Sequence, residues 1–392
     1  MNLNARTCVL LIVWSLAGVT VGLGADELPA QQTQWQVRSG EGMDALLLIG
    51  AASGDVMQAG IYVDEIAYVR ENISAQGLEA LAQLDTALRQ DLGRLTGPSL
   101  AYVFSAGPLD TIDEVIASAA DPVGRLKRGL ETSPHWDPQE FEGALTIMPA
   151  VHTALVGLRD MGFRDWYAET QRPSIEAAIE TNMAAVSPYD IIPEQARLLG
   201  RPLDPTIEIL VVAFAKPYGI RILGQRFVAW YGWEGATQLR IAAHEIFHPP
   251  YDPNDAELDS LLADLERDPW MRSIVEGHDP KFGYNSFEGV VNEGSTQALD
   301  QIVSERLGFA EDPGERWRES DGGMHMLAAA LYHAMLEDGF AEQGGVYAEW
   351  FKSALRRGLL SPTSVRVRAA AIAGQDAVDA WGPSRQARVP SD

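Results

Sequence analysis

Apolar and polar positions recur with the period of a helix over much of the first half of the chain. Between residues 73 and 95 (ISAQGLEALAQLDTALRQDLGRL), apolar residues return every three or four positions, which predicts an amphipathic helix. The same pattern predicts helices over 109–130, 138–161 and 174–186, with breaks at proline-containing pairs. Residues 26–60 are rich in glycine, glutamine and alanine, and their pattern gives no firm assignment.

The pattern changes after Pro202. Residues 206–215 (TIEILVVAFA) are β-branched and apolar and are bounded by prolines, which predicts a strand. Residues 220–223 and 227–231 predict two further short strands, with Gly224 in the turn between them. A small sheet is therefore expected near the middle of the sequence.

Helical patterns return after this sheet. Asp252 followed by Pro253 predicts a helix start, and Asn285 with Glu288 has the spacing of a capping box. Gly308 predicts the end of the helix that follows this box. The expected helices span 252–268, 287–307, 323–337 and 346–357.

These elements predict an α+β fold that is mostly helical, with a small mixed sheet and a helical C-terminal part. We expect three segments. They are a leader over 1–25, a mostly helical N-terminal region of unknown role over 26–200, and a second domain over 201–385.

The leader has the layout of a secretory signal peptide. Residues 7–24 are apolar, Arg6 precedes them, and Asp26-Glu27 begins a polar stretch. An uncleaved membrane anchor is the alternative. Cleavage would remove Cys8, the only cysteine, and would leave no thiolate to bind a metal. We expect an extracytoplasmic protein, periplasmic or secreted, in which no other stretch is long and apolar enough to span a membrane.

Composition adds a constraint on partners. The chain of 392 residues is 46% hydrophobic, as globular proteins are. It carries 30 Lys and Arg against 55 Asp and Glu, for a net charge of −25. Such a charge repels polyanions, so we expect no nucleic-acid partner.

Residues 244–248 read His-Glu-Ile-Phe-His, an H-E-x-x-H motif. Histidines four positions apart lie on one face of a helix, so both imidazoles can bind one ion, and Glu245 can contact a water on that ion. A chance match is expected on the order of one per cent of the time in a chain of this length and histidine content. The motif therefore predicts a metal site with ligands His244 and His248.

A catalytic zinc site usually has a third protein ligand. Tyr251 and Asn254 stand where the metzincin continuation needs glycine and histidine, which excludes that class. The helix over 287–307 carries Asn292-Glu293-Gly294, and Glu293 can reach back to the motif from there. Glu293 is the expected third ligand.

Residues 206–307, with these motifs, resemble the gluzincins, zinc peptidases with H-E-x-x-H on one helix and a glutamate ligand on a later one. The resemblance implies a zincin-like catalytic domain over 201–385 that binds Zn²⁺ and cleaves peptide or protein substrates, with Glu245 as general base. It also implies that an edge strand, 220–223 or 227–231, pairs with an extended peptide. In the thermolysin type an aspartate four residues after the glutamate orients a zinc histidine. Gln297 stands here instead, and Asp300 can take that role.

Gluzincins also direct a downstream tyrosine or histidine at the oxyanion. His325 and Tyr332, seven residues apart on an expected helix, are our candidates. The other candidates are His278, His333, Tyr251, Tyr284 and Tyr347. Two rival interpretations stay open: a zinc hydrolase of a non-peptide substrate, and a secreted binding protein with a structural or decayed zinc site.

Overall fold

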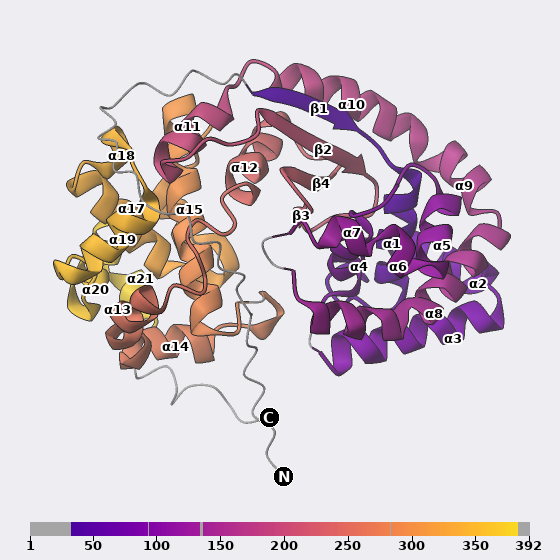
Figure 1. Ribbon diagram of the computed structural model, residues 1–392, viewed down its shortest axis with the longest axis horizontal. Coiled ribbons are helices and arrows are strands. Elements are labelled where there is room, and N and C mark those ends of the chain that lie inside the picture. The colour runs from indigo at the N-terminus through magenta and orange to yellow at the C-terminus, as the bar shows by residue number, and fades with distance from the viewer. Residues whose placement is uncertain (1–32, 93, 134–135, 283, 383–392) are drawn as a thin grey trace, which may run out of the picture.

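The computed structural model describes residues 33–92, 94–133, 136–282 and 284–382. The expected signal peptide over 1–25, with Cys8, lies outside these residues. Helices gather in two lobes, an N-terminal lobe coloured indigo to magenta and a C-terminal lobe coloured orange to yellow, with a small sheet beside them (Figure 1). The expected class, mostly helical α+β with a small mixed sheet, is confirmed.

The sheet has four strands in the order β1-β2-β4-β3. The β1–β2 and β2–β4 pairs are parallel, and β3 runs antiparallel to β4. Of the two strands expected to form an edge, only β3 is one, because β4 lies between β2 and β3. The strands are β1 (Gln34–Arg38), β2 (Thr206–Val212), β3 (Ile220–Ile222) and β4 (Arg226–Trp230).

Strand β1 comes from the stretch that sequence patterns left unassigned. Gln34 pairs with Thr206 and Arg38 with Leu210, so the sheet includes a strand from the expected N-terminal region 26–200. The sequence QWQVR alternates polar and apolar residues as a strand does, but the segment is only five residues long and its partner lies far away in the chain, so the sequence analysis did not assign it. The sheet thus draws strands from both sides of residue 200.

The N-terminal lobe is built from short helices around α1, which is buried along its whole length. The helix expected over 73–95 forms as α3 followed by a π-helix, η1. The helix expected over 109–130 is three helices, because Asp121 caps a new start at Pro122. The helices that precede β2 in the chain are α1 (Glu41–Ala52), α2 (Val63–Asn72), α3 (Ala75–Leu84), η1 (Asp85–Gln90), α4 (Thr96–Phe104), α5 (Ile112–Ala120), α6 (Pro122–Arg125), α7 (Lys127–Leu130), α8 (Pro138–Asp160), α9 (Phe163–Thr170), α10 (Arg172–Val186) and α11 (Ile191–Leu199). Of these, α11 packs against α12 (Gly235–Glu245) and α15 (Phe287–Leu307) beside the C-terminal lobe (Figure 1).

Helix α8 differs from expectation in one respect. Among the described residues, it is the helix long and apolar enough to cross a membrane, with a mean hydropathy of 1.3 over its most apolar window. Sequence inspection had indicated no such stretch after the leader. The core helix of a soluble protein meets the same criteria, and α8 packs against α3 and α5 here.

The C-terminal lobe surrounds α15, whose bounds are the expected ones. Two expected caps are wrong: Ser286, not Asn285, caps α15, and Asp255, not Asp252, caps α13. Gly308 ends α15 with a φ of 81°, as expected. The helices are α12 (Gly235–Glu245), α13 (Ala256–Arg267), α14 (Pro269–Gly277), η2 (Pro280–Phe282), α15 (Phe287–Leu307), α16 (Pro313–Glu319), η3 (Ser320–Gly323), α17 (Met326–Glu337), α18 (Phe340–Gln343), α19 (Tyr347–Arg356), α20 (Pro362–Ala373) and α21 (Gln375–Asp379).

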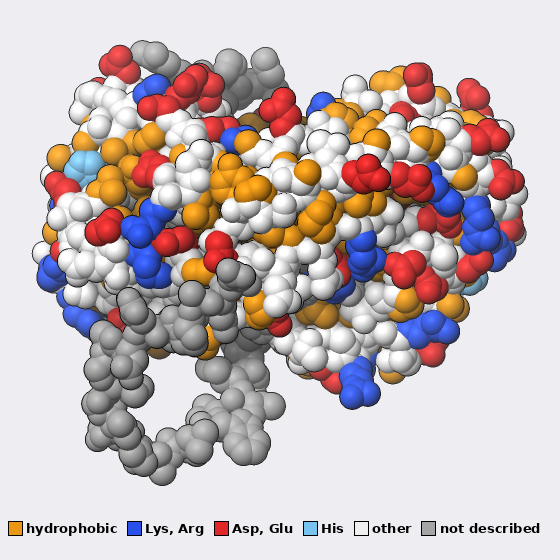
Figure 2. Space-filling view, turned by 90° about the horizontal axis from the view of Figure 1, so that it is seen from above, with side chains coloured by type: hydrophobic (Ala, Val, Ile, Leu, Met, Phe, Trp, Pro, Cys, Tyr) orange, Lys and Arg blue, Asp and Glu red, His pale blue; other side chains and the backbone are white. Residues whose placement is uncertain are grey.

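Acidic and basic side chains are interspersed over both lobes on the face that Figure 2 shows, around a band of hydrophobic side chains. On this face the acidic side chains are therefore spread rather than gathered in one patch (Figure 2).

Candidate metal centre

The motif stands at the end of α12, which follows β4 and packs against it. The buried Leu239, Ala242 and Ala243 face the core. The side-chain amide of Gln195 on α11 donates to the carbonyls of Ala242 and Ala243, at 3.2 and 3.0 Å. Helix α11, which packs against α12 and α15 beside the C-terminal lobe (Figure 1), therefore helps to fix the end of this helix.

We had expected His248 to lie on the same helix as His244. Helix α12 ends at Glu245, however, so His248 lies in the turn that follows it. Phe247 N–H donates to the carbonyl of His244 at 3.0 Å, which tightens this turn. Pro249 and Pro250 then prevent the helix from continuing. The tightened turn still brings the Nε2 atoms of His244 and His248 to 3.0 Å from each other.

Glu293 completes the cluster from the middle of α15, which packs against α12. Its Oε1 lies 3.6 Å from His244 Nε2, and its Oε2 lies 3.5 Å from His248 Nε2. The structure thus brings together the three residues that the sequence proposed as ligands.

These atoms fit a bound metal ion in spacing and in chemistry. Two ligand atoms bound to zinc at 2.0–2.1 Å in a tetrahedron lie about 3.3 Å apart, close to the separations of 3.0–3.6 Å here. Glu293 Oε2 is buried and has no hydrogen-bond partner among the described residues. Because a buried carboxylate oxygen without a partner is costly, a cation is the natural occupant. This buried group could hold a metal ion.

His244 is oriented by a carboxylate on the same helix as Glu293. Its Nδ1 donates to Asp300 Oδ2 at 2.8 Å, which leaves Nε2 as the metal-binding nitrogen. Arg316 Nη2 donates to the same Asp300 oxygen at 3.0 Å. Asp300 therefore has the orienting role that the sequence suggested, and Arg316, which sequence reasoning missed, supports it.

The other ring is held by weaker contacts. His248 Nδ1 faces Asn292 Oδ1 at 3.4 Å and Thr296 Oγ1 at 3.3 Å. Gln297 does not contact a histidine: its amide nitrogen donates to Glu293 Oε1 at 2.8 Å. One face of α15 thus carries five polar side chains that serve the site, Asn292, Glu293, Thr296, Gln297 and Asp300.

The electrostatics couple the three proposed ligands. Burial opposes charge on His244, but the carboxylates of Glu293 and Asp300 outweigh it and raise the pKa of His244 to about 9. Burial and the neighbouring His244 lower the pKa of His248 to about 4. Burial disfavours ionised Glu293, but the two histidines outweigh burial and lower its pKa to about 2. The site is built around a permanently ionised carboxylate, as a cation site requires.

Glu245 is placed differently from the ligands. Burial raises the pKa of its carboxyl to about 7, against the opposing influence of His244 and Arg221. The carboxyl makes no ion pair with any described residue. A carboxyl with this pKa can take up and release a proton near neutral pH.

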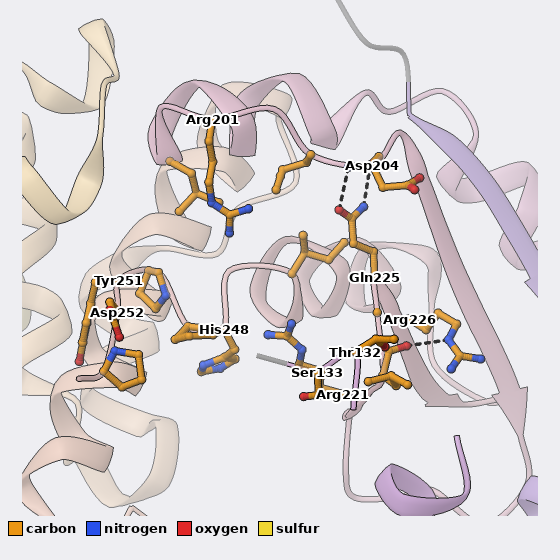
Figure 3. Close-up of a pocket in the computed structure, with 18 of the residues that line it drawn as sticks. Thr132, Ser133, Arg201, Asp204, Arg221, Gln225, Arg226, His248, Tyr251 and Asp252 are labelled. Atoms are coloured by element: carbon orange, nitrogen blue, oxygen red, sulfur yellow. Dashed lines mark hydrogen bonds between the residues drawn. The ribbon is translucent and has the colours of Figure 1, made fainter. Parts of the chain in front are cut away.

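A cavity of about 1280 Å³ opens beside His248. Its wall is formed by β3, the turn after α12, the end of α11 and the connection that leads to α8. Arg221 of β3 and Arg201, just after α11, point into this cavity near His248 (Figure 3). Sequence reasoning missed both arginines, because a single arginine in a short strand or in a connecting segment carries no local signal.

Of the two residues proposed to act on the oxyanion, His325 lies near the candidate centre and Tyr332 does not. His325 lies close enough to Glu293 that its positive charge is one cause of the lowered pKa of Glu293, although its Nε2 contacts Asp321 Oδ2 at 2.7 Å. The ring of Tyr284 packs against His325, with centroids 5.7 Å apart, and the hydroxyl of Tyr284 lies beside Glu293. Of the other candidates that the sequence offered, Tyr284 thus lies with His325 near the candidate centre.

Tyr332 lies elsewhere, and its proposed catalytic role is corrected. Its hydroxyl donates to the carboxylate of Glu305, at 2.7 and 2.9 Å. Glu305 follows Glu293 by twelve residues on α15, which is about 18 Å along the helix. Helix α17 begins only at Met326, so His325 and Tyr332 do not share one helical face as expected.

No family model matches this chain, and no curated protein or solved structure is significantly similar to it.

Proposed function

We propose that this protein is a zinc-dependent hydrolase that cleaves peptide bonds and that its C-terminal part is zincin-like. The convergence of His244 Nε2, His248 Nε2 and the Glu293 carboxylate carries the proposal, together with Glu245, which forms no ion pair within the described part of the chain. Two imidazoles and one carboxylate are a known ligand set of catalytic zinc, and they leave a fourth position open. Imidazole ligands favour zinc over magnesium or calcium, which prefer oxygen.

Zinc bound here would act as a Lewis acid and lower the pKa of a water molecule to about 7. In the proposed reaction Glu245 accepts a proton from the attacking water and passes it to the amine nitrogen that leaves. Asp300 holds the His244 ring by its Nδ1 proton, and Gln297 holds the Glu293 carboxylate. Tyr284 and His325 are the nearest candidates to donate to the developing oxyanion.

A peptide substrate is supported by the surroundings of the cluster. The cavity beside His248 is large enough for several residues of an extended chain. Strand β3 is an edge strand and contributes Arg221 to the cavity wall, which continues at Leu223 just after the strand. An extended peptide can add to such an edge through main-chain hydrogen bonds.

The proposed location outside the cytoplasm depends on the sequence of residues 1–25 alone. Intact-mass measurement of the protein isolated from its native host would test it. Loss of the leader is expected, and a full-length cytoplasmic chain would contradict it.

The test of the function separates metal binding from catalysis. Zinc per chain and hydrolysis of a mixed peptide library are measured for the wild type, Glu245→Gln, Glu293→Ala and the control Glu288→Ala, an exposed carboxylate on the same helix. We expect Glu245→Gln to keep zinc and lose activity by about 10²- to 10⁴-fold, the usual value of a general base. Glu293→Ala should lose zinc, and Glu288→Ala should resemble the wild type.

Other outcomes would identify the rival interpretations. Unchanged activity in Glu245→Gln would refute the mechanism, and full zinc occupancy in Glu293→Ala would remove the third ligand. Zinc without peptidase activity, but with hydrolysis of esters or simple amides, would indicate a non-peptide substrate. Zinc with no hydrolysis of any substrate would indicate a structural site.

A further inference from the structure

Arg221 occupies an unusual position for an arginine. It is the central residue of β3, between the buried Ile220 and Ile222, and its guanidinium is largely enclosed by protein. Its Nη1 is buried without a hydrogen-bond partner in the described parts of the chain, and no described carboxylate forms an ion pair with it. Burial lowers the pKa of Arg221, but arginine stays charged at physiological pH.

Neighbouring arginines are satisfied by the protein itself. Arg226 on the adjacent strand donates to the carbonyl of Leu223 at 2.7 Å and lies 3.8 Å from Glu208. Arg316, also buried, is bonded to Asp300. A buried cation without a partner is destabilising, and Arg221, unlike Arg226 and Arg316, has no such partner among the described residues. This difference indicates that an anion from outside the chain pairs with Arg221.

The charge of Arg221 acts on the candidate centre. It is one cause of the lowered pKa of His248, and it opposes the raised pKa of Glu245. Figure 3 shows the guanidinium directed into the cavity that His248 lines. Arg201 enters the same cavity, makes no ion pair with any described residue, and is close enough to lower the pKa of Arg221. In a chain of charge −25, two arginines without carboxylate partners thus meet beside the metal cluster.

We propose that Arg221, assisted by Arg201, binds the free C-terminal carboxylate of a peptide whose scissile bond lies next to that carboxylate. This inference depends on the proposed function and adds its substrate class, peptides shortened from their C-terminus. A guanidinium binds a carboxylate through two parallel hydrogen bonds, which fixes both position and orientation. Water adds across the C–N bond: the acyl carbon gains the oxygen, and the amine nitrogen gains the proton through Glu245.

A peptide pair tests this proposal. An N-acetylated tripeptide is compared with the same tripeptide whose C-terminus is an amide, so that only the carboxylate differs. The wild type should cleave the free acid about 10- to 100-fold faster, the value of a charge-assisted hydrogen-bonded pair. In Arg221→Gln the ratio of the two rates should fall towards one, and Arg221→Lys should keep part of it. Arg226→Gln, the matched change on the next strand, should preserve the ratio.

Binding gives a second readout that needs no turnover. The affinity of zinc-loaded Glu245→Gln for each peptide is measured by calorimetry, with and without Arg221→Gln. The free acid should bind about tenfold or more tightly, and only while Arg221 is present. Equal affinity for both peptides overturns the proposal, whether or not the wild type is active.

Turnover distinguishes the two proposals from each other. A wild type that cleaves both peptides equally, with Arg221→Gln slowing both alike and shifting the pH profile, would show that Arg221 serves Glu245. The carboxylate proposal would then fail while the peptidase stands. A wild type that cleaves no peptide, yet binds the free acid through Arg221, would overturn the peptidase and keep the carboxylate site.

Discussion

Two buried carboxylates, Asp44 in the N-terminal lobe and Glu293 in the C-terminal lobe, have opposite surroundings. Asp44 is fully buried on α1, where its Oδ1 accepts from the backbone N–H of Ala213 and Phe214 and its Oδ2 accepts from the hydroxyl of Tyr167. Glu293 Oε1 accepts from the side-chain amide of Gln297, the hydroxyl of Tyr284 lies beside the carboxylate, and Oε2 has no close hydrogen-bond partner among the described residues.

The difference between the two carboxylates indicates that Asp44 stabilises the fold, whereas Glu293 is available to bind a ligand. All three donors to Asp44 come from elements that it ties together, α9 and the end of β2, so the group holds the N-terminal lobe to the sheet. Glu293 instead faces two imidazoles that have their own partners behind them. A saturated carboxylate is part of the scaffold, and an unsaturated one keeps its capacity for a ligand.

Alanine substitution should give the largest contrast. Asp44→Ala leaves three buried donors unpaired, each costing about 1–3 kcal/mol, so a stability loss of roughly 4 kcal/mol is expected. Glu293→Ala removes the acceptor of Gln297 and the attraction of the carboxylate for His244 in a site that Figure 3 shows beside an open cavity, so metal-free protein should lose less, about 2 kcal/mol. Urea unfolding with a chelator present measures both, and equal losses would refute the contrast.

The next largest effect is expected in the pH dependence of stability, to which the ionisation of Asp44 should contribute. Burial raises the pKa of Asp44 from 3.8 to about 7, despite three donors that favour the ionised form. Because the folded state then holds a proton that the unfolded state has released, stability is lost as the pH rises towards 7. Between pH 5 and pH 7 this group alone should cost about 2 kcal/mol.

Asp44→Asn is the control for this dependence, since an amide cannot titrate. The difference in unfolding free energy between the wild type and Asp44→Asn is measured at both pH values. A difference that does not change with pH would show that Asp44 is ionised throughout.

Asp300, the hydrogen-bond partner of His244, offers a test at the candidate metal centre around Glu293. Asp300→Asn removes the charge that holds Nδ1–H, so metal affinity should fall by about 10- to 100-fold. Asn292→Ala removes a longer contact to His248, at 3.4 Å, and should have a smaller effect. Competition with a chromogenic chelator measures both affinities, and the reverse order would show that His248 is the more strictly oriented ligand.

The smallest effect is expected at the start of α15. Ser286 accepts from Gly289 N–H at 3.0 Å, so Ser286→Ala should lower stability by about 1 kcal/mol. Metal affinity should not change, because the polar face begins a turn and a half later, at Asn292. Asn285→Ala is the control, and thermal unfolding should separate the two variants. A larger loss of stability in Asn285→Ala than in Ser286→Ala would show that Asn285 caps α15, as the sequence suggested.

Sequence patterns predicted the parts of the fold that local signals determine. The bounds of α15 followed from its pattern and from Gly308, and β2 from its β-branched run. Strand β1 was missed because its partner is remote, and α20 because its arginines and alanines show no clear apolar face. The cap of α13 was misplaced because several aspartates precede the helix and spacing does not choose among them.

The candidate site divides in the same way. The motif and helical spacing were enough to propose His244, His248, Glu293 and Asp300, since these residues lie on or next to two helices. Tyr332 was wrong because helical phase does not tell which neighbour a face meets. Tyr284 was only one of several secondary candidates, and Arg221 was not singled out, because their positions depend on how the segment before α15 and β3 pack against other elements.

The parallel pairing of β1 with β2 has a consequence for synthesis on the ribosome. Arg38 and its salt-bridge partner Glu208 are 170 positions apart, so β1 emerges long before the strand it joins. At about 5–20 residues per second, this delay is roughly 10 to 30 s. During that time the N-terminal helices can collapse on one another while β1 still exposes an unpaired edge. Chaperone binding to nascent chains should therefore peak before residue 206 emerges and fall once β2 has been released.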